Sequence, residues 1–329
     1  MKTVYYNPCF IASASSDATL CGNRQDSLQI SQDISMVVEN GVISGFLPTS
    51  SVDSRLRAES VEIRDCSGVS IIPGFSDSHT HMLYCGDRTR EFFQRAGGKK
   101  YLEILNEGNG ILKTVRDTRG KSPDDILSAS MERIRRDIRS GVTSIEFKSG
   151  YGLDLETEVS IIGAMKLLKE MNIVDVASTF LGMHSVPPEM GADQYVDFIM
   201  EDVFPLINKD VDFVDSFCDE GAFSPEQTDR FFSAASSSGV GLRLHSDEIS
   251  SIGCLSLAKK HSIVSADHLL KIGKTGIEEL KDKGTIATLL PITAFSLGEK
   301  YADARKRKVC HQGFFLLYPL QFSICHFPH

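Results

Sequence analysis

The segment VSIIPGFSDSHTH, residues 69–81, decides the fold of this 329-residue chain. Its first half, residues 69–75, has the length and the apolar composition of a buried β-strand. His79 and His81 follow that run, and residues two apart in an extended segment point to the same side. We therefore expect two imidazole rings to converge at the carboxyl end of a first strand.

Six further runs rich in β-branched residues predict strands at residues 142–147, 174–180, 211–217, 240–245, 263–266 and 285–290. Helical stretches separate them, and two begin with Ser-Pro and an acidic residue, at Ser122 and Ser224. Seven such units in a chain of this size predict an α/β fold, a (β/α)8 TIM-like barrel whose eighth strand is missing from the pattern. An open doubly wound sheet is the alternative, but no Gly-x-Gly-x-x-Gly turn follows any of these strands.

Three segments differ in their patterns. Residues 1–72 predict a small β-rich domain of the sandwich type, in which Asn40-Gly41 between apolar runs is a strong hairpin signal. Residues 73–309 carry the predicted barrel. Residues 310–329 form an apolar tail that contains no Asp, Glu, Lys or Arg.

Charge and cysteine usage narrow the function classes. Acidic residues outnumber basic ones by 44 to 35, a formal net charge of -9, and no basic run is present, which argues against nucleic acid as a partner. No apolar stretch reaches the ~20 residues that span a bilayer, so we expect no membrane association. The eight cysteines are scattered without a C-x-x-C pair, which favours the cytoplasm.

Histidines mark the ends of three predicted strands. Besides His79 and His81, His245 ends the fifth strand and His268 follows the sixth. A lone histidine at such a position is usually a polar cap, but barrel active sites lie at the carboxyl ends of the strands, and several histidines there favour a metal site. A divalent cation held by His79, His81 and His245 would keep a position open for water and lower the pKa of that water.

Other polar residues share the same predicted rim. Glu248 could accept and return a proton, and His268 could polarise a carbonyl group. The alternative for Glu248 is a solvated acid at a helix entry. Tyr151 and His184 follow the second and third strands, so we expect them beside the same cavity.

The chain resembles the imidazolonepropionases of the amidohydrolase superfamily. The likeness spans about residues 38–305 and is carried by PGFSDSHTH (73–81), GDR (86–88), GIL (110–112), TVR (114–116), KSGYGL (148–153), FLGMH (180–184) and HSDE (245–248). It implies hydrolysis of 4-imidazolone-5-propanoate to N-formimidoyl-L-glutamate in histidine degradation, with one zinc or iron ion, a small-molecule substrate and a homodimer. It also implies metal ligation by His79, His81 and His245, catalysis by Glu248 and His268, and substrate contacts from Arg88, Tyr151, His184 and Glu248.

The resemblance ends after Lys308. The family continues into an eighth strand with a metal-ligating Asp, whereas residues 310–329 hold four Phe and three His. We interpret His311, His326 and His329 as incidental and expect weakened metal binding, unpaired strand edges and impaired activity. Two alternatives stay open: another amidohydrolase such as a heterocyclic base deaminase, and an inactive barrel that acts only through association.

Overall fold

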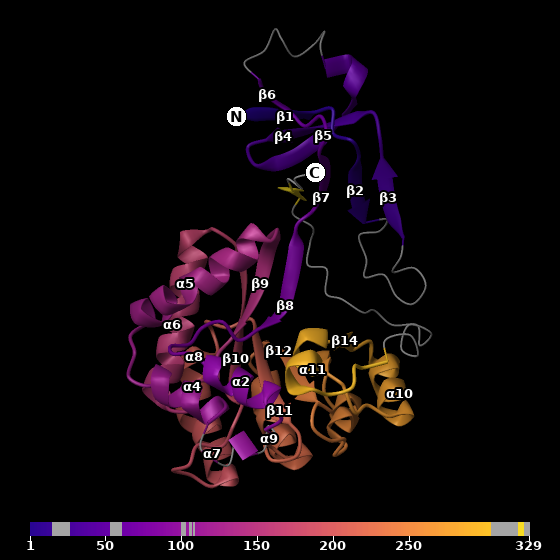
Figure 1. The fold of residues 1–329 in the computed structure, drawn as a ribbon. Helices are drawn as coiled ribbons and strands as arrows, with labels where there is room; N and C mark the ends of the chain where they lie inside the picture. Colours follow the sequence, from indigo (N-terminus) through magenta and orange to yellow (C-terminus); the bar gives the residue numbers. More distant parts are fainter. Residues whose placement is uncertain are drawn as a thin grey trace. The chain divides into compact units, whose positions relative to one another are not determined.

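The computed structural model describes residues 1–14, 27–52, 61–99, 103–104, 107, 109–303 and 322–325. The chain divides into two compact units. Of the described residues, the first unit holds 1–14, 27–52, 61–75 and 322–325, and the second holds 76–303. Figure 1 shows the strands and helices of both units.

The first unit contains two four-stranded sheets. One has the order β5-β4-β1-β6, formed by Val42–Pro48, Ile34–Glu39, Lys2–Tyr6 and Glu62–Asp65. The other has the order β15-β7-β2-β3, formed by Phe322–Cys325, Ser70–Pro73, Ile11–Ala14 and Leu28–Ser31. Ile11, Met36 and Ile71 form one buried cluster, which joins residues of both sheets. A short 3-10 helix, Thr49–Ser51, follows β5.

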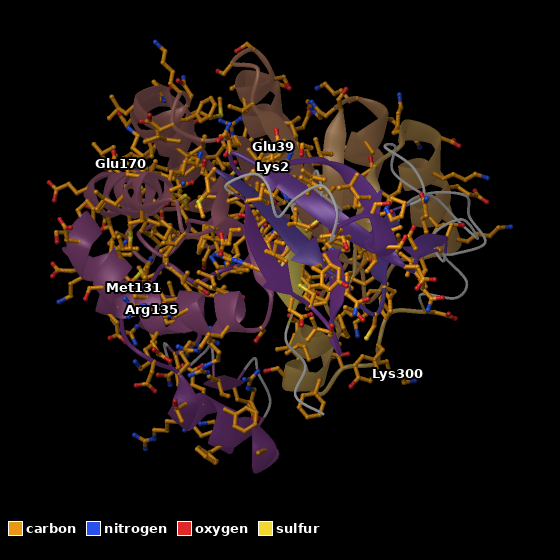
Figure 2. All side chains as sticks on the ribbon, turned by 90° about the horizontal axis from the view of Figure 1, so that it is seen from above. Lys2, Glu39, Met131, Arg135, Glu170 and Lys300 are labelled. Atoms are coloured by element: carbon orange, nitrogen blue, oxygen red, sulfur yellow. A yellow bond between two sulfur atoms is a disulfide. The ribbon has the colours of Figure 1, made fainter. Side chains whose placement is uncertain are left out.

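The Asn40-Gly41 hairpin is confirmed. It joins β4 to β5, with Glu39 opposite Val42. Asn40 and Gly41 both lie in the left-handed region, at φ 52° and 82°, as a tight hairpin turn requires. Beside it, Lys2 is paired with Glu39 across β1 and β4 at 2.9 Å, and Figure 2 shows the two side by side.

The second unit is a nearly closed barrel of seven parallel strands in the order β14-β13-β12-β11-β10-β9-β8. The strands are β8 (Phe75–Thr80), β9 (Val142–Lys148), β10 (Asp175–Met183), β11 (Phe213–Cys218), β12 (Gly241–Ser246), β13 (Ile263–His268) and β14 (Ile286–Thr288). The predicted barrel class is therefore confirmed, and the described residues hold no eighth barrel strand.

Helices follow the strands of this unit. They are α2 (Thr89–Ala96), α4 (Ile111–Thr118), α5 (Pro123–Arg139), α6 (Leu155–Met171), α7 (Ala192–Phe198), η3 (Ile199–Val203), α8 (Phe204–Ile207), α9 (Pro225–Ser236), η4 (Cys254–Lys259), α10 (Lys274–Lys283) and α11 (Pro291–Leu297). Both predicted Ser-Pro starts form capping boxes, in which Ser122 and Ser224 accept backbone bonds at 3.2 Å from residues three positions later.

The first barrel strand differs from the prediction. The apolar run at residues 69–75 supplies β7 of the small sheet, where Ile71 is fully buried. The barrel strand is β8, so His79 lies inside a strand and His81 just beyond it. The prediction was wrong because apolar composition marked the strand that packs in a hydrophobic cluster, whereas the neighbouring barrel strand carries polar side chains.

The tail also departs from expectation. Residues Phe322–Cys325 form β15, which pairs antiparallel with β7. These four residues of the tail therefore extend a sheet of the small unit, which the sequence analysis did not predict. His311, His326, His329 and the apolar run 314–318 lie outside the described residues.

Two further features concern the chain as a whole. Cys218, the last residue of β11, is disulfide-bonded to Cys254, the first residue of η4, a pairing that the scattered cysteines did not predict. Among the described residues, none of the helices is long and apolar enough to cross a membrane.

Candidate metal centre

Five histidines gather at the carboxyl ends of the barrel strands. His79 lies on β8 and His81 follows it, His245 lies on β12, and His268 ends β13. The Nε2 atoms of His79 and His81 are 3.2 Å apart, and those of His81 and His245 are 3.3 Å apart. His184 follows β10 and stacks on His81, with 4.9 Å between the ring centres. We call these five side chains the imidazole cluster.

Burial keeps four rings of the imidazole cluster poor in protons. It lowers the pKa of His79 and His184 to about 3, and neighbouring positive groups act in the same direction. Burial also lowers the pKa of His81 and His268 well below the usual value. A neutral imidazole is the form that binds metal ions. These four rings thus present neutral nitrogen donors at ordinary pH.

Two buried carboxylates hold rings of this cluster. Asp267 Oδ2 lies 2.6 Å from His79 Nδ1, and Asp215 Oδ2 lies 3.0 Å from His245 Nδ1. A carboxylate on one ring nitrogen fixes the orientation of the ring and directs its other nitrogen outward, as in many carboxylate–histidine–metal arrangements. His79 is therefore fixed in the form that offers Nε2 to a cation, and Asp215 lies beside the same nitrogen of the His245 ring.

The same carboxylates belong to a buried set of charges inside the barrel. Lys148 Nζ lies 2.7 Å from Glu146 Oε1 and 2.8 Å from Asp215 Oδ2. Arg243 Nη2 lies 3.2 Å from Asp267 Oδ2. We call these five residues the charged network. Three carboxylates against two cations leave one formal negative charge next to neutral imidazoles, which favours a bound cation.

The donors present suit a metal ion. One ligand atom from each of His79, His245 and His268 lies within 4.8 Å of the others, and the same holds for Asp215, His245 and Asp267. Nδ1 of His81 is buried without a hydrogen-bond partner. Ligands on one tetrahedral metal at ~2.1 Å are ~3.4 Å apart, close to the spacing of the Nε2 atoms.

Glu248 lies on the rim next to the imidazole cluster. Its Oε1 is 3.3 Å from His268 Nδ1. Burial raises its pKa to about 7, with the charge of Asp219 adding to the effect and His245 opposing it. A carboxyl group whose pKa lies near neutral can both accept and donate a proton under ordinary conditions.

The backbone is strained next to Glu248 and at His268. Asp247, directly before Glu248, has φ 54°, and His268 and Leu269 have φ 74° and 58°. Each such residue costs roughly 1–3 kcal/mol and persists only where its surroundings hold it, often at functional sites. Here Leu269 N donates to Ser246 O at 3.1 Å, and Lys271 N donates to Asp247 O at 2.7 Å.

The residues expected to contact substrate lie in two places. The ring of Tyr151 is 5.2 Å from that of His184, and His184 Nδ1 is 3.0 Å from Gly150 O. Arg88 precedes α2, and its Nε donates to Glu91 Oε2 at 2.9 Å. The Arg88 charge is among the influences that lower the pKa of His184, so it acts on the same site.

Gly150 is required by this packing. It adopts φ 97°, and a Cβ there would come within 2.4 Å of Leu181 O and 2.9 Å of His184 Cβ. Any side chain would therefore displace His184 from the site.

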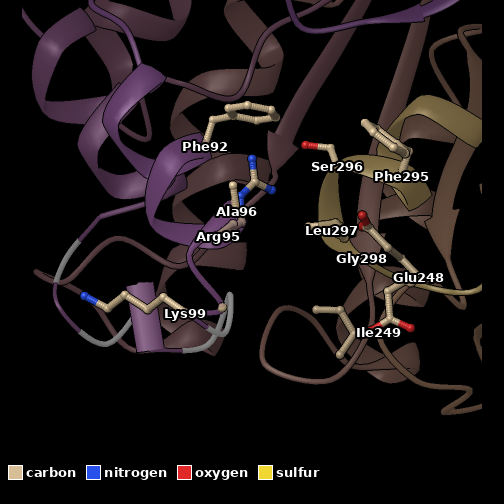
Figure 3. A pocket seen from close by; sticks show the side chains of 12 residues that line it. Phe92, Arg95, Ala96, Lys99, Glu248, Ile249, Phe295, Ser296, Leu297 and Gly298 are labelled. Atoms are coloured by element: carbon tan, nitrogen blue, oxygen red, sulfur yellow. The ribbon is translucent and has the colours of Figure 1, made fainter.

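A pocket of about 610 Å³ lies between α2 and α11 and reaches Glu248. Figure 3 shows Phe92 and Arg95 of α2 facing Phe295 and Ser296 of α11. Because Glu248 lines the pocket and also contacts His268, the pocket gives access to the rim of the imidazole cluster.

Sequence reasoning missed the charged network. Its members are Glu146, Lys148, Asp215, Arg243 and Asp267, all within barrel strands. A signal was present, because each charged residue interrupts an apolar strand, and Glu146 and Lys148 or Arg243 and His245 are spaced by two. That spacing puts both members of a pair on one face of a strand.

Comparison with known proteins finds relatives that are named imidazolonepropionase. It is 42% identical over 310 residues to the imidazolonepropionase of Parabacteroides distasonis, covering 93% of this chain and 74% of that protein. It is 38% identical over 288 residues to the imidazolonepropionase of Clostridium tetani, covering 86% and 69%. The chain belongs to the imidazolonepropionase family. No family model matches the chain.

Solved structures agree on the fold of this imidazolonepropionase family member. E. coli guanine deaminase aligns with a TM-score of 0.67 at 14% identity, covering 94% of this chain and 72% of that one. An atrazine chlorohydrolase mutant from Arthrobacter aurescens, complexed with zinc and atraton, aligns with a TM-score of 0.59 at 14% identity, covering 94% and 70%. The chain thus shares its fold with these enzymes.

Proposed function

We propose that this chain hydrolyses 4-imidazolone-5-propanoate to N-formimidoyl-L-glutamate, as its named relatives suggest, with one divalent cation held by His79, His81 and His245. The observation that carries the proposal is the convergence of their Nε2 atoms at 3.2 and 3.3 Å, beside a charged network with one excess negative charge. The identity of the substrate is inferred from the chain's membership of the imidazolonepropionase family.

The reaction adds water across the lactam C–N bond: hydroxyl goes to the carbonyl carbon, and a proton goes to the departing ring nitrogen. A bound cation would supply water of lowered pKa and polarisation of the carbonyl oxygen. Glu248 would take the proton from water and return it to the nitrogen, since its pKa of about 7 permits both steps. His268, 3.3 Å from Glu248, would hold the developing oxyanion.

Three residues would bind the rest of the substrate. The guanidinium of Arg88 is a planar fork suited to the propionate carboxylate. Glu91 fixes it at 2.9 Å and is itself held by Gly110 N at 3.0 Å, so the fork is positioned in advance. Tyr151 and His184, whose rings lie 5.2 Å apart beside His81, would contact the imidazolone ring.

Zinc and iron both suit imidazole donors, and the proposal names either. A homodimer in the cytoplasm completes it, on the strength of the family resemblance and of the scattered cysteines, which include no C-x-x-C pair. The Cys218–Cys254 disulfide is unusual for that compartment, so sedimentation and thiol titration of protein purified without reductant are the tests.

The direct test is turnover by the 329-residue chain. Protein loaded with zinc or with iron is assayed with 4-imidazolone-5-propanoate and, in parallel, with guanine and other heterocyclic bases. Hydrolysis of the imidazolone at a rate above that of a metal-depleted control supports the proposal. Deamination of a base with no hydrolysis of the imidazolone overturns it. The expected impairment of activity comes from the tail, which lies largely outside the described residues. Assaying a relative beside the chain measures the size of that impairment.

A further inference from the structure

Asp219 directly follows β11 and binds the backbone that carries Glu248. Its Oδ2 accepts bonds from Glu248 N at 2.8 Å and from Ile249 N at 3.0 Å. Its Oδ1 accepts bonds from Ser250 N at 2.9 Å and Ser250 Oγ at 3.1 Å. One carboxylate, 2% exposed, therefore holds three successive backbone N–H groups of another strand's loop.

The held segment begins in an unfavourable backbone conformation. Asp247 lies in the left-handed region at φ 54°, and this turn directs the chain from β12 to Glu248. A non-glycine residue keeps such a conformation only where neighbouring contacts fix it. The three bonds to Asp219 start at the next residue, so they stabilise the turn at the point where the strain lies.

A second link joins the same two segments. Cys218, which adjoins Asp219, is disulfide-bonded to Cys254, the first residue of η4 just beyond the loop. The loop 247–253 is thus tied to the end of β11 near both of its ends. Within this loop, Glu248 Oε1 lies 3.3 Å from His268 Nδ1, while Asp219 binds the backbone of the same residue.

We propose that Asp219 is a positioning residue for hydrolysis, which holds Glu248 within reach of His268 and of the reacting atoms. This rests on the proposed role of Glu248 as the proton carrier. A carboxylate that accepts several backbone N–H bonds fixes its loop far more firmly than solvent would. Small misplacements of a proton carrier cost up to about 100-fold in rate.

The test compares Asp219→Asn and Asp219→Ala with Asp212→Ala in the full metal-loaded chain. Asp212 is a matched control, because it directly precedes β11 as Asp219 directly follows it. Its Oδ2 accepts hydrogen bonds from Ser178 N and from Ser178 Oγ, both at 2.8 Å. We measure kcat, KM, bound metal, thermal unfolding, and hydrogen exchange of the Glu248, Ile249 and Ser250 amides.

We expect Asp219→Ala to lower kcat about 10- to 100-fold with KM and bound metal little changed. Asp219→Asn, which keeps one acceptor oxygen, should retain part of the rate and be the usable variant if alanine prevents folding. Asp212→Ala should lose stability but keep kcat. Equal kcat losses at positions 219 and 212 would overturn the proposal.

Failure of the proposed function has a separate signature. If the unaltered chain hydrolyses no 4-imidazolone-5-propanoate, the substrate assignment fails. Hydrogen exchange still decides the role of Asp219, because Asp219→Asn should speed exchange of the three amides while Asp212→Asn should not. Unchanged exchange in Asp219→Asn would overturn the positioning role.

Discussion

The imidazole cluster and the charged network lie in the same barrel, but their charge states respond differently to burial. In the imidazole cluster it removes protons, lowering the pKa of four histidines. In the charged network, opposite charges outweigh burial: the pKa of Asp267 falls well below its usual value despite desolvation, chiefly because of Arg243, and the pKa of Arg243 rises. One set therefore offers ring nitrogens to an external cation, whereas the other is held together by internal ion pairs and keeps one formal negative charge.

The largest expected effect is on the imidazole cluster. His245→Ala removes a nitrogen donor that no other described residue replaces in position, so bound metal and turnover should both fall by more than the ~100-fold that follows loss of an outer-shell partner. His261→Ala is the control, since His261 pairs with Asp229 at 2.6 Å away from the cluster. Metal analysis after dialysis measures the first effect. Equal metal content in His245→Ala and His261→Ala would contradict the assignment of metal binding to the imidazole cluster.

The charged network should matter most for stability. Lys148→Met leaves Glu146 and Asp215 without their shared cation, and breaking a buried pair costs about 3–5 kcal/mol of unfolding free energy. Lys166→Met removes an exposed partner of Asp210 and should cost about 0–1 kcal/mol. Urea denaturation of both variants gives the comparison. Similar small losses would mean that the network is not a structural element.

Asp267 joins the two sets, because it contacts His79 at 2.6 Å and Arg243 at 3.2 Å. Asp267→Asn should weaken metal affinity about 10- to 100-fold, the usual effect of losing a carboxylate behind a metal-binding histidine. Asp229→Asn makes the same change behind His261, outside the cluster, and should leave affinity unchanged. Competition with a chelator measures both. A loss confined to stability would assign Asp267 to the charged network alone.

The smallest effect is a pH dependence of stability at the rim. The folded-state pKa of Glu248 is raised to about 7 from 4.5, so folding binds a proton, and its contribution to stability is lost as pH rises from about 4.5 through 7. Glu248→Gln cannot titrate. In metal-free protein, the stability of this variant relative to the original should therefore increase between pH 5 and pH 8. A difference that does not vary with pH would show that Glu248 titrates normally.

Much of the barrel was predictable because its strands are apolar and β-branched. The run at residues 142–147 matches β9 (Val142–Lys148), and residues 240–245 match β12 (Gly241–Ser246) within one residue. β8 was not predictable in the same way, since its interior positions carry Asp77 and His79 rather than aliphatic side chains. Composition identifies a strand by the hydrophobic contacts it makes, and this strand faces a polar interior.

The residues of the candidate site also differ in how well the sequence predicted them. Histidines at strand ends were visible because they stand where barrel chemistry takes place, and the structure brings His79, His81, His184, His245 and His268 together. Asp215 and Asp267 each interrupt an apolar strand, which is a local signal, but the sequence does not show which cation each carboxylate contacts. Their roles depend on contacts with residues 24 to 188 positions away, such as Lys148, Arg243 and His79.

The most direct test of the central claim is X-ray absorption spectroscopy of the 329-residue chain loaded with one equivalent of zinc after removal of endogenous metal. The account predicts a first shell dominated by imidazole nitrogens at ~2.0–2.1 Å, with outer-shell imidazole scattering that is lost in His245→Ala. A first shell of oxygen atoms only, or a spectrum unchanged by that substitution, would contradict a metal centre in the imidazole cluster.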